Sequence, residues 1–231
     1  MIFGLFRFDW TILIVIPGLI ISLWAQFKVQ STYKKYSTFY TQKRMTGADA
    51  ARRILDSEGL YHIKIEHISG NLNDHYDPRA DVIRLSDAVY ASTSAAALGV
   101  AAHEAGHALQ HAKGYAPMKF RSAIIPVTRF GSMLSIPLFF IGLLMYSEYL
   151  MLFGIILYST VAFFQLVTLP VEFNASRRAL AVLGGSAMLT KDELKAAKEV
   201  LTAAALTYVA ALLTSILTIL RLLVLANNRR R

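Results

Sequence analysis

The stretch VAAHEAGHALQH, residues 100–111, has the pattern His-Glu-x-x-His at its centre. Residues four apart lie on one face of an α-helix, so His103 and His107 can direct two imidazoles at one metal ion. Glu104 is one position further round the helix and can reach a water on that metal without being a ligand. Two neutral imidazoles, an open coordination position and a nearby carboxylate are what zinc-assisted hydrolysis requires. The stretch therefore predicts a zinc helix, and the rest of the chain must supply a third ligand.

The composition indicates a membrane protein. The 231 residues are 55% hydrophobic, and the mean hydropathy of +0.45 is high for a soluble protein. The chain has no cysteine, which excludes disulfides and thiolate zinc sites and leaves histidine and carboxylates as metal ligands. The chain combines a net charge of +9 with long apolar runs. We therefore attribute the charge to basic loops at an anionic membrane face. Nucleic-acid binding is not expected.

Four apolar runs predict four membrane helices, at residues 10–27, 130–147, 149–171 and 200–220. The first run follows Arg7 but has no Ala-x-Ala-like cleavage site after it, so we interpret it as a retained anchor. Only Glu148 separates the second and third runs, which predicts a helical hairpin. Arg221 follows the fourth run, and we attribute its position to snorkelling towards the basic tail, residues 227–231.

The polar segments between these runs divide the chain into five parts. These are a transmembrane helix (1–27), a domain with the zinc helix (28–129), a transmembrane hairpin (130–171), a polar helix and connector (172–199), and a last transmembrane helix with a basic tail (200–231).

Helix signals are clear in the polar segments. Capping-box spacings at Thr46–Asp49 and Thr190–Glu193 predict two helix starts, the first helix ending near Ser57. Ser92, Thr93 and Ser94 are all suitable N-caps for the zinc helix, which we expect to run from residue 95 to about 113, before Gly114.

A small sheet is predicted between residues 60 and 86. Residues 61–68 alternate in the manner of a strand, and residues 81–86 predict a second strand. The stretch 74–79, DHYDPR, is polar and contains a proline, so we expect a loop there.

A downstream acid is needed as the third ligand. A histidine six residues after His107 is excluded because position 113 is lysine, which leaves Glu148, Glu172, Asp192, Glu193 and Glu199. Glu148 falls in the hairpin turn, and helix capping accounts for Asp192 and Glu193. Glu172 is favoured because it comes just after Pro170, where an apolar run ends, and Glu199 stays open as an alternative.

These motifs resemble a known group of enzymes. The pattern His103-Glu104-x-x-His107 followed by Glu172-x-x-Ala175 resembles the gluzincin zinc peptidases. With the flanking apolar runs, the chain is similar to the membrane metallopeptidases related to HtpX and the CAAX prenyl proteases. The stretches 74–79, 98–111 and 169–180 resemble the YugP-like family of bacterial membrane zinc metallopeptidases.

The resemblance implies a fold and a set of ligands. The fold is a mainly α membrane protein of about four transmembrane helices with a gluzincin-like α+β metallopeptidase domain carrying a small β-sheet. One zinc ion per chain would be bound by His103, His107 and Glu172, with Glu104 as the catalytic base.

One position departs from the gluzincin pattern. Gluzincins often have an aspartate four residues after the ligand glutamate, where it supports a ligand histidine, but this chain has Ser176. Ser176 or Asn174 is open for that role, and Arg177 also lies nearby in sequence. His111, one turn beyond His107, is either a fourth ligand or, as we favour, a supporting residue.

Substrate contacts are expected from the polar stretch and the second strand. His75 and Tyr76 either bind substrate or stabilise an oxyanion, or they form a plain turn. The strand at 81–86, with Ile83 and Arg84 at its middle, is expected to align an extended peptide by edge pairing.

The sequence thus predicts a zinc-dependent endopeptidase that cleaves membrane or membrane-proximal polypeptides. The alternative is a catalytically inactive zinc-binding scaffold that recruits other membrane proteins; a transporter is disfavoured because the spans have few ionisable groups. The bilayer and a polypeptide substrate are the expected partners. The basic polar segments place the catalytic domain in the cytoplasm, although Arg7 and Arg229–Arg231 then fall outside, against the positive-inside rule.

Overall fold

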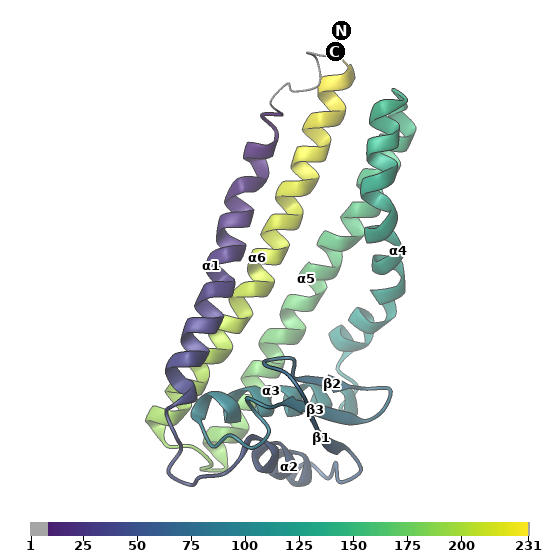
Figure 1. Cartoon of the computed structure of the whole chain (residues 1–231). Coiled ribbons are helices and arrows are strands. Elements are labelled where there is room, and N and C mark those ends of the chain that lie inside the picture. Colours follow the sequence, from purple (N-terminus) through teal and green to yellow (C-terminus); the bar gives the residue numbers. More distant parts are fainter. Residues whose placement is uncertain (1–8, 231) are drawn as a thin grey trace. The chain divides into compact units, whose positions relative to one another are not determined.

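The structure is a computed structural model that describes residues 9–230, with side chains for residues 9–228. Arg7 and Arg231 therefore lie outside the described residues, as do the side chains of Arg229 and Arg230. The described elements are α1 (Ile12–Ser37), α2 (Gly47–Ser57), β1 (Lys64–Ile68), β2 (His75–Asp77), β3 (Val82–Ser86), α3 (Ala95–Ala112), α4 (Ala116–Leu144), α5 (Glu148–Gly185) and α6 (Lys191–Arg230) (Figure 1). The predicted fold class, mainly α with a small sheet, is confirmed.

Four of these helices are long and apolar enough to cross a membrane: α1, α4, α5 and α6. Each overlaps one of the four predicted apolar runs, although α4 begins well before its run and ends at Leu144. Helix α5 continues without a break across the predicted boundary at residue 171, although Pro170 lies inside it. The polar residues after Pro170 therefore belong to the same helix as the apolar run before it.

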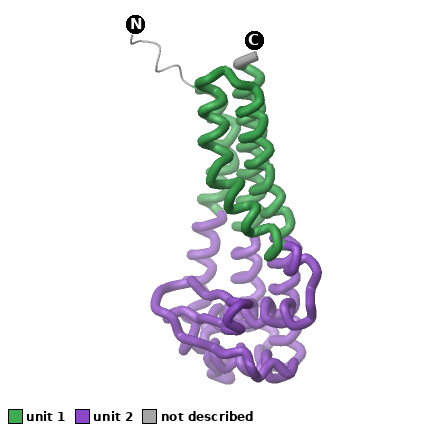
Figure 2. The backbone as a smooth tube through the Cα atoms, turned by 90° about the vertical axis from the view of Figure 1, so that its right-hand side faces the viewer, with its two compact units in different colours: residues 1–24, 121–167, 207–231 green, residues 25–120, 168–206 purple. Residues whose placement is uncertain are grey.

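The chain forms two compact units, shown in different colours in Figure 2. Unit 1 comprises residues 1–24, 121–167 and 207–231, and unit 2 comprises residues 25–120 and 168–206. Helices α1, α5 and α6 each contribute to both units. Unit 2 contains most of the predicted zinc domain together with the polar segment that follows Pro170.

Unit 1 contains an ion pair of Arg221 that the sequence did not predict. The guanidinium donates from Nη2 to Asp9 Oδ2 at 2.9 Å and from Nε to Thr11 Oγ1 at 3.3 Å. Arg221 thus binds residues just before α1. Snorkelling towards the tail stays a prediction, because the side chains of residues 229–231 lie outside the described residues.

Unit 2 holds a three-stranded mixed sheet in the order β1-β3-β2. Strand β3 pairs with β1 in parallel, Ile65 opposite Ile83, and with β2 antiparallel, Tyr76 opposite Ile83. The predicted sheet is confirmed, but the loop expected at 74–79 contains β2. The expectation that β3 pairs with a substrate edge-on was wrong, because both of its edges are already occupied.

The helix starts in unit 2 follow their sequence signals. Thr46 and Asp49 form both halves of the predicted capping box at the start of α2. Thr190 and Glu193 exchange the corresponding bonds before α6. Ser94 caps α3 by accepting from the backbone N–H of Ala97.

Small residues let α3 pack closely inside unit 2. A Cβ atom on Gly106 would lie only 2.7 Å from the carbonyl oxygen of Ala175 on α5, and one on Gly99 would lie 3.2 Å from the Cβ of Ala197 on α6. Distances below about 3 Å are not tolerated by real Cβ atoms. The backbone of α3 can therefore approach α5 only because position 106 is glycine.

Candidate metal centre

Three predicted ligands converge in unit 2. Helix α3 supplies His103 and His107, α5 supplies Glu172, and their ligand atoms all lie within 4.8 Å of one another. The Oε2 atom of Glu172 lies 3.2 Å from Nε2 of His103 and 3.6 Å from Nε2 of His107. Two imidazole nitrogens and one carboxylate oxygen thus face a common point.

The local sequence explains why the two helices meet here. Glu172 and Ala175 are three positions apart, so they lie on one face of α5. Ala175 presents its backbone to Gly106, next to His107 in sequence. The close approach at Gly106 brings Glu172 to the two imidazoles, one turn earlier on α5.

Gln110 orients one of the ligand imidazoles. It is fully buried, and its amide nitrogen donates to the carbonyl of Val171 at 2.8 Å and to Oδ1 of Asn174 at 3.0 Å. Its Oε1 atom therefore faces Nδ1 of His107, at 3.0 Å. An oxygen there requires the proton of His107 to be on Nδ1, which leaves the Nε2 lone pair for a metal.

Sequence reasoning missed Gln110 because a glutamine carries no metal-site motif. A weak signal was present: Gln110 is three residues after His107, so its amide lies on the same side of α3.

Ser176 supports the other imidazole. Its Oγ atom lies 3.1 Å from Nδ1 of His103, which directs Nε2 of that ring to Glu172. Asn174, the other candidate for this role, instead accepts from Gln110 and from Nε of Arg178. The exposed Arg177 makes no hydrogen bond within the described part of the chain.

The centre contains two carboxylates beside its imidazoles and is largely buried. Glu172 is 3% exposed, and His107 and Glu104 are each 8% exposed. Burial acts most strongly on the pKa of His107 and lowers it, but the hydrogen bond to Glu172 and the charges of Glu104 and Glu172 outweigh burial and raise that pKa. The surrounding carboxylates thus favour positive charge at this point.

Glu104, the expected catalytic base, lies on α3, and its role stays a prediction. It follows His103 on α3, and its carboxylate makes no hydrogen bond to any described residue. Asp74, in the loop before β2, is close enough to interact with it. Burial raises the pKa of Asp74 most, hydrogen bonds from Ser86 lower it, and the charge of Glu104 adds to the increase.

His111 lies outside the group of metal donors. Its Nδ1 atom is 2.9 Å from the hydroxyl oxygen of Tyr76. That hydroxyl donates its proton to Oδ1 of Asp81 at 3.0 Å. Burial and the hydrogen bond to Asp81 raise the pKa of Tyr76, so this phenol stays protonated at neutral pH. The interaction joins β2 to the end of α3.

The remaining predicted substrate residues are not part of the metal group. His75 is exposed on β2, and Ile83 is fully buried in β3. Arg84 pairs with Glu66 at 3.2 Å and with Asp77 at 3.1 Å, across both edges of β3. Their roles in substrate binding stay predictions.

The alternative third ligand, Glu199, is not in the group either. Its Oε2 atom accepts from the hydroxyl of Tyr36 at 2.6 Å and lies 3.6 Å from Nζ of Lys35.

Comparison with known proteins agrees with this geometry. Residues 11–227 match the model of a family described as "Putative neutral zinc metallopeptidase". The curated protein "Putative membrane protease YugP" of Bacillus subtilis (strain 168) is 47% identical over 219 residues, which cover 95% of this chain and 97% of that protein. The chain belongs to the neutral zinc metallopeptidase family. No solved structure matches it.

The donor set of this chain fits zinc. Histidine nitrogen and carboxylate oxygen are zinc ligands, and three protein ligands leave the fourth position open, as in catalytic sites. Both imidazoles are held through Nδ1, so each offers Nε2. The resemblance to the YugP-like family drawn from the sequence is confirmed.

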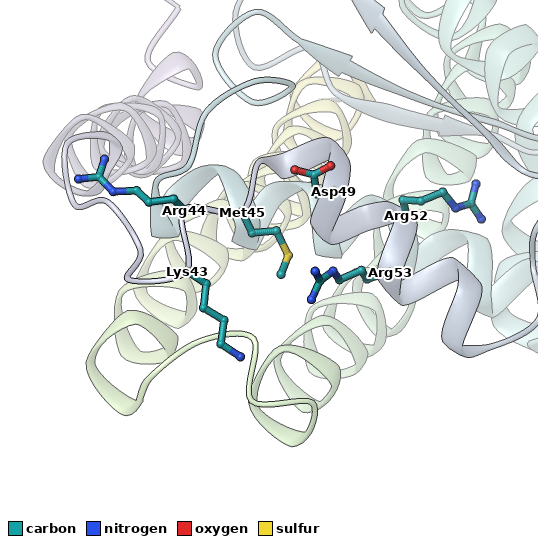
Figure 3. A pocket seen from close by; sticks show the side chains of 6 residues that line it. All are labelled: Lys43, Arg44, Met45, Asp49, Arg52 and Arg53. Carbon is teal, nitrogen blue, oxygen red and sulfur yellow. The ribbon is translucent and has the colours of Figure 1, made fainter.

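The chain also has a basic pocket of about 670 Å³ in unit 2, lined by Lys43, Arg44, Met45, Asp49, Arg52 and Arg53 (Figure 3). None of these is a predicted site residue. Arg44 and Arg52 point away from its centre, and Nζ of Lys43 donates to the carbonyl of Ala187 at 2.6 Å.

Proposed function

We propose that this chain is a membrane-embedded zinc-dependent endopeptidase of the gluzincin type. The observation that carries the proposal is the convergence of His103, His107 and Glu172 on one point, with the unbonded carboxylate of Glu104 on the same helix. The family and the named relative support peptidase chemistry.

The residues of the centre would divide the reaction between them. His103, His107 and Glu172 would hold the ion, and Gln110 and Ser176 fix the two imidazoles. When bound, zinc polarises the scissile carbonyl and makes a water acidic near neutral pH. Glu104 accepts the proton of the attacking water and then gives it to the leaving amine nitrogen.

The free edge for the substrate is proposed to be β2 rather than β3. Strand β2 pairs only with β3 among the described strands. It is joined to the zinc helix through Tyr76 and His111. An extended polypeptide added along β2 would have its main chain aligned by strand hydrogen bonds.

Membrane-associated polypeptides are the proposed substrates. Glu172 lies on the same continuous helix as the apolar run that ends near Pro170. A ligand on that helix suits a peptide that reaches the centre from the membrane side.

The catalytic unit is proposed to face the cytoplasm, on the grounds of its lysine and arginine content. Because the chain has no cysteine, Tyr115→Cys and Arg230→Cys variants can be labelled in intact cells with an impermeant thiol reagent. Labelling at position 230 alone is expected. Labelling at position 115 alone would show that the catalytic unit faces the outside of the cell.

The proposal is tested with Glu104→Gln, which keeps the shape of the side chain and removes the base. Membrane-protein fragments are compared by proteomics in cells expressing wild type and variant, and zinc is measured in both purified proteins. We expect both to retain zinc and only wild type to produce fragments. Zinc retention by wild type with no cleavage of an effective substrate would favour an inactive scaffold, and full activity of Glu104→Gln would refute the mechanism.

A further inference from the structure

One buried hydroxyl of unit 2 has no hydrogen-bond partner among the described residues. It belongs to Thr168 on α5, which is 2% exposed and whose Oγ1 atom is buried. Leaving a buried donor unpaired costs free energy, so such a group in a folded protein needs a physical reason. Thr168 lies four positions before Glu172, and this spacing points to the metal centre.

Other hydroxyls on the long helices are bonded to their own helix. A hydroxyl that donates to the carbonyl oxygen four residues earlier, at 2.8 or 2.9 Å, is found at Ser159, Thr214, Ser215 and Thr218. This is a usual way for serine and threonine to satisfy their donor inside a helix. For Thr168 the corresponding acceptor is the carbonyl of Phe164, and that bond is not formed. The donor of Thr168 is therefore not used by α5 itself.

Thr168 lies on the side of α5 that packs against the zinc helix. The buried residues of α5 in unit 2 recur at helical spacing and share this side: Thr168, Val171, Glu172, Ala175, Ala179 and Leu183. Ala175 approaches Gly106, and Glu172 lies beside the two ligand imidazoles. Thr168 is one turn further along the same side.

The carboxylate of Glu172 is within reach of this hydroxyl. Cβ atoms four positions apart on a helix are separated by about 5–6 Å, and long side chains lean back over the preceding turn. For Glu172 that turn contains Thr168. A carboxylate has about four acceptor positions, so coordination of a metal through one oxygen leaves it able to accept a hydroxyl proton. Rotation about the Cα–Cβ bond of Thr168 is enough to form the bond.

We propose that Thr168 is a positioning residue of the metal centre, whose hydroxyl donates to the carboxylate of Glu172 when the centre holds zinc. The inference rests on the zinc site of the proposed function and needs no particular substrate. A donor to the carboxylate fixes its direction and satisfies part of its charge in a buried site. Thr168 thus supports the third ligand as Gln110 and Ser176 support the two imidazoles.

Two substitutions separate the hydroxyl of Thr168 from its shape. Thr168→Val keeps the shape and loses the hydroxyl, whereas Thr168→Ser keeps the hydroxyl and loses a methyl group. If the residue acted only through packing, the valine variant would bind zinc at least as well as the serine variant. A hydrogen bond to Glu172 predicts the opposite order.

The test is the zinc affinity of the full-length protein in detergent, measured by chelator competition. Thr168→Val should bind zinc about tenfold more weakly than wild type, as expected when a ligand loses its supporting partner, and Thr168→Ser should stay within about twofold of wild type. Without metal, Thr168→Val should unfold at the same temperature as wild type or higher, because it removes an unpaired buried donor. Weaker zinc binding would then not come from a less stable fold.

Thr218→Val on α6 is the matched control. It removes a hydroxyl that is bonded within its own helix in unit 1, and it should keep the wild-type zinc affinity. Equal zinc affinity of wild type and Thr168→Val would overturn the proposal, as would weaker binding by Thr168→Ser than by Thr168→Val.

A second hydroxyl-free variant keeps the test decisive. If Thr168→Val does not fold, wild-type zinc affinity in a folded Thr168→Ala protein would refute the role of the hydroxyl. A wild-type protein that binds no zinc would contradict the metal centre of the proposed function as well. Zinc binding by wild type with no effect of the hydroxyl would contradict only the role of Thr168, so the two failures are distinguishable.

Discussion

Oε1 of Gln110 accepts a hydrogen bond from Nδ1 of His107 at 3.0 Å, while the amide nitrogen of Gln110 holds α5 through Val171 and Asn174. One buried side chain thus orients a ligand on α3 and fixes the helix that carries Glu172. The separation between the two helices and the direction of the imidazole are set together.

Gln110→Ala is therefore expected to weaken zinc binding by about 10–100-fold, the usual effect of losing a partner that orients a ligand. Zinc affinity is measured by chelator competition. Gln30→Ala on the exposed face of α1 is the control and should bind as wild type does. Unchanged affinity in Gln110→Ala would show that packing alone orients His107.

Ser176 lies 3.1 Å from Nδ1 of His103, at the position where gluzincins often have an aspartate. Ser176→Ala should reduce zinc affinity several-fold, because Nδ1 of His103 loses a hydrogen-bond partner. Ser176→Asp should restore affinity or increase it, since a carboxylate is a stronger acceptor for the imidazole N–H. Chelator competition distinguishes these outcomes, and tighter binding by Ser176→Ala than by Ser176→Asp would contradict the assigned contact.

Gly106→Ala places a methyl group 2.7 Å from the carbonyl oxygen of Ala175. Overpacking of this kind costs about 1–3 kcal/mol, and here it also moves Glu172 away from the imidazoles. We expect a lower unfolding midpoint and weaker zinc binding. Gly185→Ala is the control, because nothing lies within 4 Å of its new methyl group. Similar losses in the two variants would rule out a specific clash at position 106.

The ion pair in unit 1 is tested with a double-mutant cycle. Arg221→Leu, Asp9→Leu and the combined variant are compared by thermal unfolding, with a coupling of about 1 kcal/mol expected because both side chains are partly exposed. Arg129→Leu, an exposed arginine of α4, should have little effect. Additive effects at positions 9 and 221 would indicate that the pair contributes no coupling.

The features predicted well from the sequence are those with local signals. The spacing of His103 and His107, the N-cap within residues 92–94 and the capping box at Thr46 each depend on contacts within one or two helical turns, so a short window of sequence is enough to predict them. Glu172 was favoured because few acids follow His107 and only one closely follows Pro170.

The features that sequence reasoning missed depend on distant parts of the chain. Strand β2 has three residues and only Tyr76 is buried, so it has no periodic pattern and exists because β3 pairs with it. Arg221 finds Asp9 212 positions away. Gln110 acquires its role only when Val171 and Asn174 are brought against it.

The metal centre is built from segments far apart in the chain: His103 and Glu172 are separated by 69 positions, with α4 and most of α5 between them. A ribosome delivers the N-terminal part first. Both histidines and the base are therefore synthesised well before the third ligand. Two histidines are one ligand short of a catalytic zinc site. Because Glu172 is made last, the three candidate donors are present together only after α5 has been synthesised through residue 172.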